Sequence, residues 1–89
     1  MIVDDGGYGM LRYDQARLGL TPVGVDLASP DFAAVAAAFG LRSRVVANLG
    51  PGLASALAAA LHAGEPNVIV ATAALAPPRN TSPRWYRGP

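Results

Sequence analysis

Three short stretches that contain consecutive apolar residues predict three β-strands, at residues 1–3, 41–47 and 68–71. The second run is centred on Val45 and Val46. The third contains no polar residue, which is typical of a parallel strand covered on both faces. The first run is shorter than the average strand of about five or six residues. We therefore expect it to be part of a longer strand, and the chain to be a fragment of a larger domain.

The stretches between these runs carry signals for three helices. Residues 10–18 can form a short helix that ends at Gly19. The second helix has clearer signals: Ser29 is a favourable N-cap residue, Pro30 suits the first helical position, and Gly40 occupies the usual place after a helix.

Apolar residues at helical spacing predict which face of each long helix is buried. These stripes comprise Phe32, Val35 and Phe39 in the second helix, and Leu53, Leu57 and Leu61 in the third, which spans residues 51–63. The order of elements is strand, helix, helix, strand, helix, strand. Such alternation predicts an α/β fold with a parallel sheet and right-handed crossovers, built from about three strands and three helices.

Composition limits the chain to one small domain. The 89 residues are 52% hydrophobic, with a formal net charge of +1 and no cysteine. We expect residues 1–75 to form a partial domain, which at this size buries a smaller share of its surface than a larger one. Residues 76–89 contain four prolines and three arginines, which predicts an extended tail.

The same composition argues against several classes of function. A nearly neutral chain has no electrostatic footprint for nucleic acid or for an anionic membrane. The alanine-rich stretch at residues 53–63 is too short to span a bilayer, and the acidic residues 1–9 do not resemble a secretory signal. The absence of cysteine fits a reducing compartment, so we expect a cytoplasmic protein.

The most informative stretch follows the first strand, where Asp4 and Asp5 lead into a turn with three glycines, at Gly6, Gly7 and Gly9. Ligands of open α/β sheets gather at the carboxyl ends of strands. Two carboxylates there could hold Mg²⁺, which prefers oxygen ligands and is usually shared with phosphates. The alternative is that the two aspartates cap the following helix and favour its positive end.

The stretch at residues 4–12, Asp-Asp-Gly-Gly-Tyr-Gly-Met-Leu-Arg, resembles the second half of the metal and cofactor motif of thiamine-diphosphate-dependent enzymes. The resemblance is to the group of acetolactate synthases, benzoylformate decarboxylases and related 2-oxo acid decarboxylases. Residues 24–33, 50–53 and 66–70 resemble later segments of the same family, in the same order. The implied fold is the C-terminal part of a Rossmann-like thiamine-diphosphate-binding domain.

The resemblance implies a cofactor site for thiamine diphosphate and Mg²⁺. Asp5 stands where the family has a metal-binding asparagine, and Gly7 where a backbone carbonyl completes the coordination. Tyr8, Gly9 and Met10 would lie near the thiamine ring, although ordinary packing of a helix start explains them equally well. The chain departs from the family by having Asp4-Asp5 in place of Asn-Asn, which adds negative charge beside a diphosphate.

Two parts of the family's catalytic apparatus are not found in these 89 residues: the Gly-Asp-Gly half of the motif and the glutamate that activates the cofactor. We therefore expect the isolated chain to be inactive, with no catalytic residue of its own, and its status as an enzyme stays open. Its expected partners are the small-molecule cofactor and either further copies of itself or the remainder of a parent enzyme. The alternative is a non-catalytic α/β interaction module or a decayed gene fragment.

Overall fold

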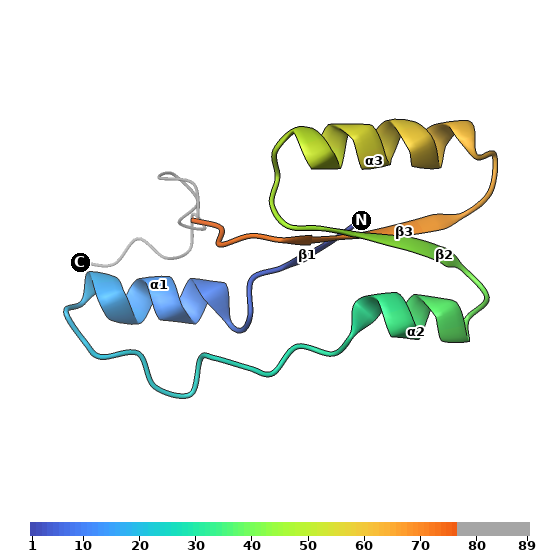
Figure 1. Ribbon diagram of the computed structural model, residues 1–89. Coiled ribbons are helices and arrows are strands. Elements are labelled where there is room, and N and C mark those ends of the chain that lie inside the picture. The colour runs from blue at the N-terminus through green and yellow to red at the C-terminus, as the bar shows by residue number, and fades with distance from the viewer. Residues whose placement is uncertain (77–89) are drawn as a thin grey trace, which may run out of the picture.

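The computed structural model describes residues 1–76, which form three strands and three helices (Figure 1). In chain order these are β1 (Ile2–Asp4), α1 (Gly9–Arg17), α2 (Phe32–Ala38), β2 (Arg42–Val46), α3 (Pro51–His62) and β3 (Asn67–Thr72). The predicted order of elements is confirmed, and the predicted ends differ from the observed ones by at most two residues. The proposed tail lies outside the described residues, apart from Ala76.

The three strands form one parallel sheet in the order β1-β3-β2, which confirms the predicted α/β fold. The last strand is central, and its Val70 lies opposite Ile2 of β1 on one side and Val45 of β2 on the other. Because both of its edges are paired and both of its faces covered, this strand has to be apolar. Ile69, Val70 and Ala71 are accordingly buried.

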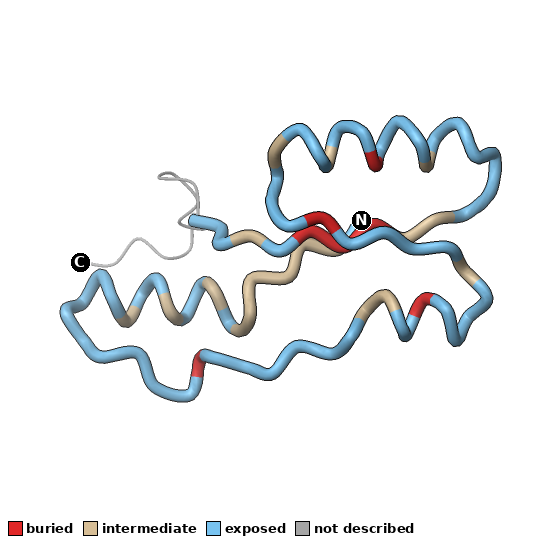
Figure 2. The backbone as a smooth tube through the Cα atoms, in the orientation of Figure 1, coloured by how far each residue is buried: buried red, intermediate tan, exposed pale blue. Residues whose placement is uncertain are grey.

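Helices α2 and α3 lie on opposite faces of the sheet, as Figure 1 shows. On the α3 face, Ala56 packs with Val46, Ile69 and Ala71 into the main apolar cluster. On the other face, α2 contributes one buried residue, Ala36. Most buried positions therefore lie on the sheet or on the helices facing it, with one more in the segment between α1 and α2 (Figure 2).

The predicted apolar stripes of the helices are wrong at most positions. In α3, Leu61 is 83% exposed, whereas Ala56 is 2% exposed. In α2, Phe39 lies just beyond the last helical residue and is 78% exposed, whereas Ala36 is buried. The small alanines let each helix lie close to the sheet, and this close approach leaves the larger neighbouring side chains on the flanks of the helix.

The predicted N-cap of α2 is also wrong. The helix begins at Phe32, and its N-cap is Asp31, whose side chain accepts a hydrogen bond of 3.0 Å from the amide of Ala34. Ser29 is engaged elsewhere, because its hydroxyl donates to the carboxylate of Asp4 at 2.6 Å. The predicted end is correct: Gly40 follows the helix with a φ of +75°, a conformation that glycine adopts at little cost.

Helix α1 contains no buried residue and packs against no other helix or strand of residues 1–76. It lies instead beside the segment that connects it to α2 (Figure 1). The side-chain oxygen of Gln15 accepts a hydrogen bond of 2.9 Å from the amide of Val23 in that segment. No helix within residues 1–76 is long and apolar enough to cross a membrane.

Candidate cofactor site

The candidate site is the turn between β1 and α1, where both aspartates bend back onto the following backbone. Asp4 Oδ1 accepts a hydrogen bond of 3.0 Å from the Gly6 amide, and Asp5 Oδ1 accepts one of 3.2 Å from the Gly7 amide. The N-cap of α1 is Tyr8, and no side chain within residues 1–76 caps the helix. The aspartates therefore form no capping hydrogen bond to α1 and shape the turn itself. Asp5 Oδ2 nevertheless lies against Gly9 at the start of the helix, where a negative charge is favoured.

The carboxylate of Asp4 is held by a residue from a distant part of the chain. Its Oδ1 accepts the hydroxyl of Ser29 as well as the Gly6 amide. Hydrogen bonds to the charged form, first from Ser29 and then from Gly6, lower the pKa of Asp4. Asp4 thus stays ionised and connects the end of β1 to the segment before α2.

The turn is paired with a short extended segment, residues 25–27. The amide of Tyr8 donates to the carbonyl of Val25 at 2.7 Å, and the amide of Leu27 donates to the carbonyl of Gly6 at 2.9 Å. These two bonds flank an antiparallel bridge between Gly7 and Asp26. Val25 is only 2% exposed, so this pairing has a small buried centre of its own, separate from the main cluster on the sheet.

At two positions of the turn, Gly7 and Gly9, neighbouring atoms lie too close to leave room for a side chain. A Cβ atom on Gly7 would collide with the carbonyl oxygen of Val25, and one on Gly9 would collide with Oδ2 of Asp5. Any side chain at residue 7 would therefore separate the paired segments. A side chain at residue 9 would push the carboxylate of Asp5 out of its place beside the start of α1.

Arg12, in the first part of α1, connects this helix to the turn and to the segment at residues 25–27. Its Nε and Nη2 atoms donate to Oδ1 of Asp26 at 3.0 and 2.8 Å, and its Nη1 atom donates to the backbone carbonyl of Asp5 at 3.3 Å. One guanidinium thus connects α1 to the turn after β1 and to the segment at residues 25–27. Helix α1 itself packs against no described strand or other helix.

A cavity of about 250 Å³ adjoins the turn on the α2 side of the sheet. Asp4, Asp5, Gly7 and Ser29 contribute its polar lining. The rest is apolar and comes from Ile2, Val3, Leu27, Ala28, Pro30 and Phe32. The carboxylates therefore lie at the wall of a hollow rather than on a flat surface.

The donor atoms of the turn fit a hard cation shared with a phosphate. The Gly7 carbonyl accepts no hydrogen bond within residues 1–76, and Asp5 Oδ2 accepts none either, which leaves two oxygen donors. Residues 1–76 contain no group of three or more acidic or histidine side chains that could enclose a metal by themselves. Mg²⁺ is typically held by only one or two carboxylates, with waters and substrate phosphates completing its shell.

The predicted ring-binding residues lie at the start of α1. Tyr8 and Met10 are more than half exposed, and Gly9 lies against Asp5. The side chains of Tyr8 and Met10 are therefore accessible to a ligand. Contact of the three residues with a thiamine ring stays a prediction. Sequence reasoning missed Arg12, Asp26 and Ser29. Their only signal was the resemblance to the family, of residues 4–12 for Arg12 and of residues 24–33 for Asp26 and Ser29. Nothing in their spacing indicates that they meet residues 4–7.

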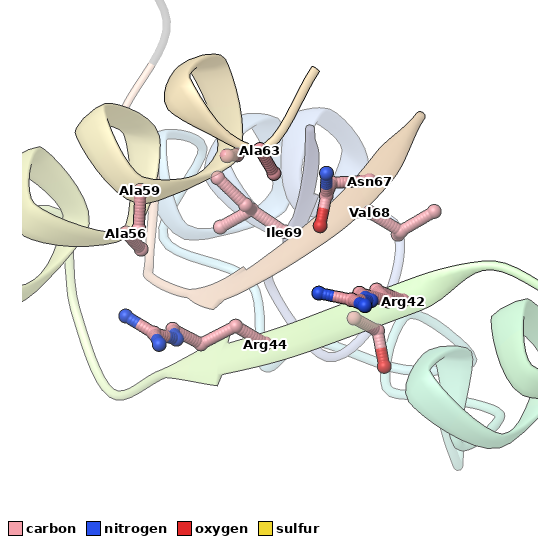
Figure 3. Close-up of a pocket in the computed structure, with 10 residues that line it drawn as sticks. Arg42, Arg44, Ala56, Ala59, Ala63, Asn67, Val68 and Ile69 are labelled. Carbon is pink, nitrogen blue, oxygen red and sulfur yellow. The ribbon is translucent and has the colours of Figure 1, made fainter. Parts of the chain in front are cut away.

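A second cavity, of about 180 Å³, lies between α3 and the sheet (Figure 3). Arg42 and Arg44 of β2 extend along it beside the alanines of α3. It is lined by the amino-terminal part of β3, whereas ligands of parallel sheets bind beyond the carboxyl ends of the strands. Arg42 is also paired with Glu65 at 2.8 Å. This cavity is therefore not the candidate site.

A parallel sheet with helices on both faces, and an oxygen-rich turn beyond the carboxyl end of a strand, define an α/β ligand-binding domain. Residues 1–71 match the family model described as "Thiamine pyrophosphate enzyme, C-terminal TPP binding domain". The chain belongs to this family, and its cofactor is thiamine diphosphate, the same molecule as thiamine pyrophosphate. No curated protein and no solved structure matched the sequence.

Proposed function

We propose that the turn at residues 4–10 holds the metal and diphosphate end of thiamine diphosphate in an enzyme that acts on 2-oxo acids, of the acetolactate synthase or decarboxylase type. The observation that carries this proposal is that Asp5 and Gly7 both line the cavity beyond β1, while Asp5 Oδ2 and the Gly7 carbonyl accept no hydrogen bond within residues 1–76. The subgroup rests on the resemblance of residues 4–12 and of the three later segments.

In this proposal each residue of the turn has a limited task. Asp5 and the Gly7 carbonyl would hold Mg²⁺, which would neutralise charge on the diphosphate. Gly9 leaves room for the carboxylate, and Tyr8 and Met10 flank the flat ring, for which an aromatic side chain and a thioether are suitable neighbours. Bound thiamine diphosphate supplies the carbanion chemistry on the 2-oxo acid.

The first metal-binding aspartate and the activating glutamate of the family are not among the 89 residues. We propose that both come from outside this sequence and that the isolated chain binds the cofactor without turning over substrate. In the complete site, the negative charge of Asp4 and Asp5 repels the diphosphate. Binding of the diphosphate therefore depends more on a divalent cation than it would with an Asn-Asn pair.

The test is calorimetric titration of the full chain with thiamine diphosphate, with and without Mg²⁺. We expect binding only when both are present, and a melting temperature that rises with ligand. A ligand at 100 times its Kd adds about 2.7 kcal/mol to the free energy of unfolding. The variant Asp5→Ala should weaken binding at least about tenfold, since even residues behind a metal ligand contribute that much.

Asp14→Ala is the matched control, because Asp14 is an exposed aspartate of α1 whose side chain makes no hydrogen bond within residues 1–76. It should bind like the wild type. An unchanged melting temperature at millimolar cofactor and Mg²⁺ would contradict the proposal and favour the non-catalytic α/β module. Equal losses in Asp5→Ala and Asp14→Ala would contradict the role of Asp5.

A further inference from the structure

Arg12 of α1 contacts both the turn after β1, at Asp5, and the segment at residues 25–27, at Asp26. Its Nη1 atom reaches the carbonyl of Asp5, whose side chain is the proposed metal ligand, and two of its other nitrogens converge on Asp26. Asp26 in turn forms the backbone bridge with Gly7, the second proposed ligand. Arg12 and Asp26 therefore touch the backbone of both ligating residues while leaving their donor oxygens free.

The exposure of this pair argues against a role in overall stability. The side chain of Arg12 is 31% exposed and that of Asp26 is 83% exposed. Ion pairs in contact with solvent contribute little to stability, because water screens the two charges. A geometric role is favoured instead, because α1 has no buried residue and packs against no strand or other helix of residues 1–76, so that hydrogen bonds such as those of Arg12 and Gln15 set its position.

We propose that Arg12 and Asp26 form a positioning pair that orients the Asp5 carboxylate and the Gly7 carbonyl toward the metal–diphosphate complex. The Asp5 carbonyl belongs to the peptide that leads into Gly6, so a donor fixed on this oxygen restricts rotation of that peptide. Asp26 holds the guanidinium in place from the opposite segment. This inference rests on the proposed function, since it assigns a role within the same site.

The positioning role predicts a different result from a model in which Arg12 contacts the phosphate directly. If Arg12 acts through Asp26, then Arg12→Ala, Asp26→Ala and the double variant should all weaken the binding of Mg²⁺ and thiamine diphosphate by the same factor, about tenfold. Arg12→Lys should recover only part of the loss, because an ammonium group cannot match the forked geometry of a guanidinium.

Amide hydrogen exchange of the ligand-free chain supplies a second measurement. We expect faster exchange at Tyr8 and Leu27, whose amides make the two bonds that flank the bridge, in both single variants. Arg42→Ala is the matched control: Arg42 also makes an exposed ion pair of 2.8 Å, but with Glu65 and on a different edge of the sheet. It should change neither the affinity nor the exchange at Tyr8 and Leu27.

Two results would overturn the positioning role. The first is a loss of affinity in Arg12→Ala with none in Asp26→Ala and unchanged exchange, which would mean that Arg12 contacts the anionic ligand directly. The second is wild-type exchange and affinity in both variants. If the wild-type chain binds no cofactor at all, the proposed function fails, and exchange at Tyr8 and Leu27 then decides by itself whether the pair orders the turn.

Discussion

At the scale of single residues, the site depends on where side chains are missing. Gly7 allows residues 25–27 to pair with the turn, and Gly9 leaves space for the Asp5 carboxylate. The obstacle differs between the two positions. A Cβ on Gly7 meets backbone, which cannot move without breaking the pairing, whereas a Cβ on Gly9 meets a side chain that can rotate away. The two glycines therefore serve folding and ligand binding to different degrees.

Gly7→Ala and Gly9→Ala should separate these two effects. We expect Gly7→Ala to lower the free energy of unfolding by about 1–3 kcal/mol, as overpacking does. Gly9→Ala should raise it by up to about 1 kcal/mol through better helix propensity, yet weaken Mg²⁺-dependent cofactor binding about tenfold by displacing Asp5. Denaturant unfolding and calorimetry measure the two quantities, and a Gly9→Ala variant with wild-type affinity would contradict the placement of Asp5.

The charge state of Asp4 leads to a prediction about pH. Its pKa is lowered by the Ser29 hydroxyl and then by the Gly6 amide. A lowered pKa in the folded state stabilises the protein above the unfolded-state value of about 3.9, and this contribution disappears as the pH falls through the folded-state pKa.

Carboxyl titration followed by NMR should therefore give Asp4 a midpoint below that of an ordinary aspartate. Ser29→Ala should move this midpoint upward, because it removes the larger of the two causes. The Asp4 midpoint in Asp14→Ala should stay where it is in the wild type. An Asp4 midpoint that is the same with and without Ser29 would show that the hydroxyl does not control its pKa.

At the scale of elements, the helices meet the sheet through alanine. Ala56 in α3 and Ala36 in α2 are buried, while the larger residues of the predicted stripes are partly or largely exposed. A helix that approaches a sheet on alanine has no room for a longer side chain at the contact point. The identity of the central residue thus matters more here than the hydrophobicity of the whole helix face.

Ala56→Leu and Leu61→Ala test this arrangement within one helix. Ala56→Leu should lower the free energy of unfolding by about 1–3 kcal/mol, because the added atoms have to separate α3 from Ile69 and Ala71. Leu61→Ala should change it by no more than about 0.5 kcal/mol, as expected for an exposed position. Thermal unfolding followed by circular dichroism measures both, and the reverse ranking would restore the leucine stripe as the packing face.

At the scale of the whole molecule, burial within the described chain is greatest at β3 and decreases away from it. This strand is paired on both sides and buried, whereas β1 and β2 are each paired on one side within residues 1–76. Helix α1 and the candidate site lie at the end of the sheet, with their own small buried centre at Val25. The candidate site is therefore attached to the core through β1 and the segment at residues 25–29.

This gradient predicts an order of amide hydrogen exchange, since local opening is easiest where few groups are buried. In the ligand-free chain, amides of β3 should exchange most slowly and those of α1 most rapidly among the six elements. Mg²⁺ with thiamine diphosphate should slow exchange in α1 and the turn while leaving β3 nearly unchanged. Equal protection of α1 and β3 in the absence of ligand would contradict this organisation.

The sequence by itself determined the type and order of the elements and the family. Apolar runs, helix spacing and glycine at helix ends act within a few residues, so they can be interpreted without knowing what lies nearby in space. The acidic, glycine-rich turn after β1 was predictable for the same reason, because Asp4, Asp5 and the three glycines are neighbours in the chain.

Only the tertiary structure decided which of these residues meet distant ones. Ser29 looked like a helix cap, but its hydroxyl is more than twenty residues along the chain from the carboxylate that accepts its hydrogen bond. The pairing of Arg12 with Asp26 and the burial of Ala56 in place of leucine depend on how closely the backbone segments approach. Such distances follow from packing the whole chain, and no local pattern of hydrophobic and polar residues contains them.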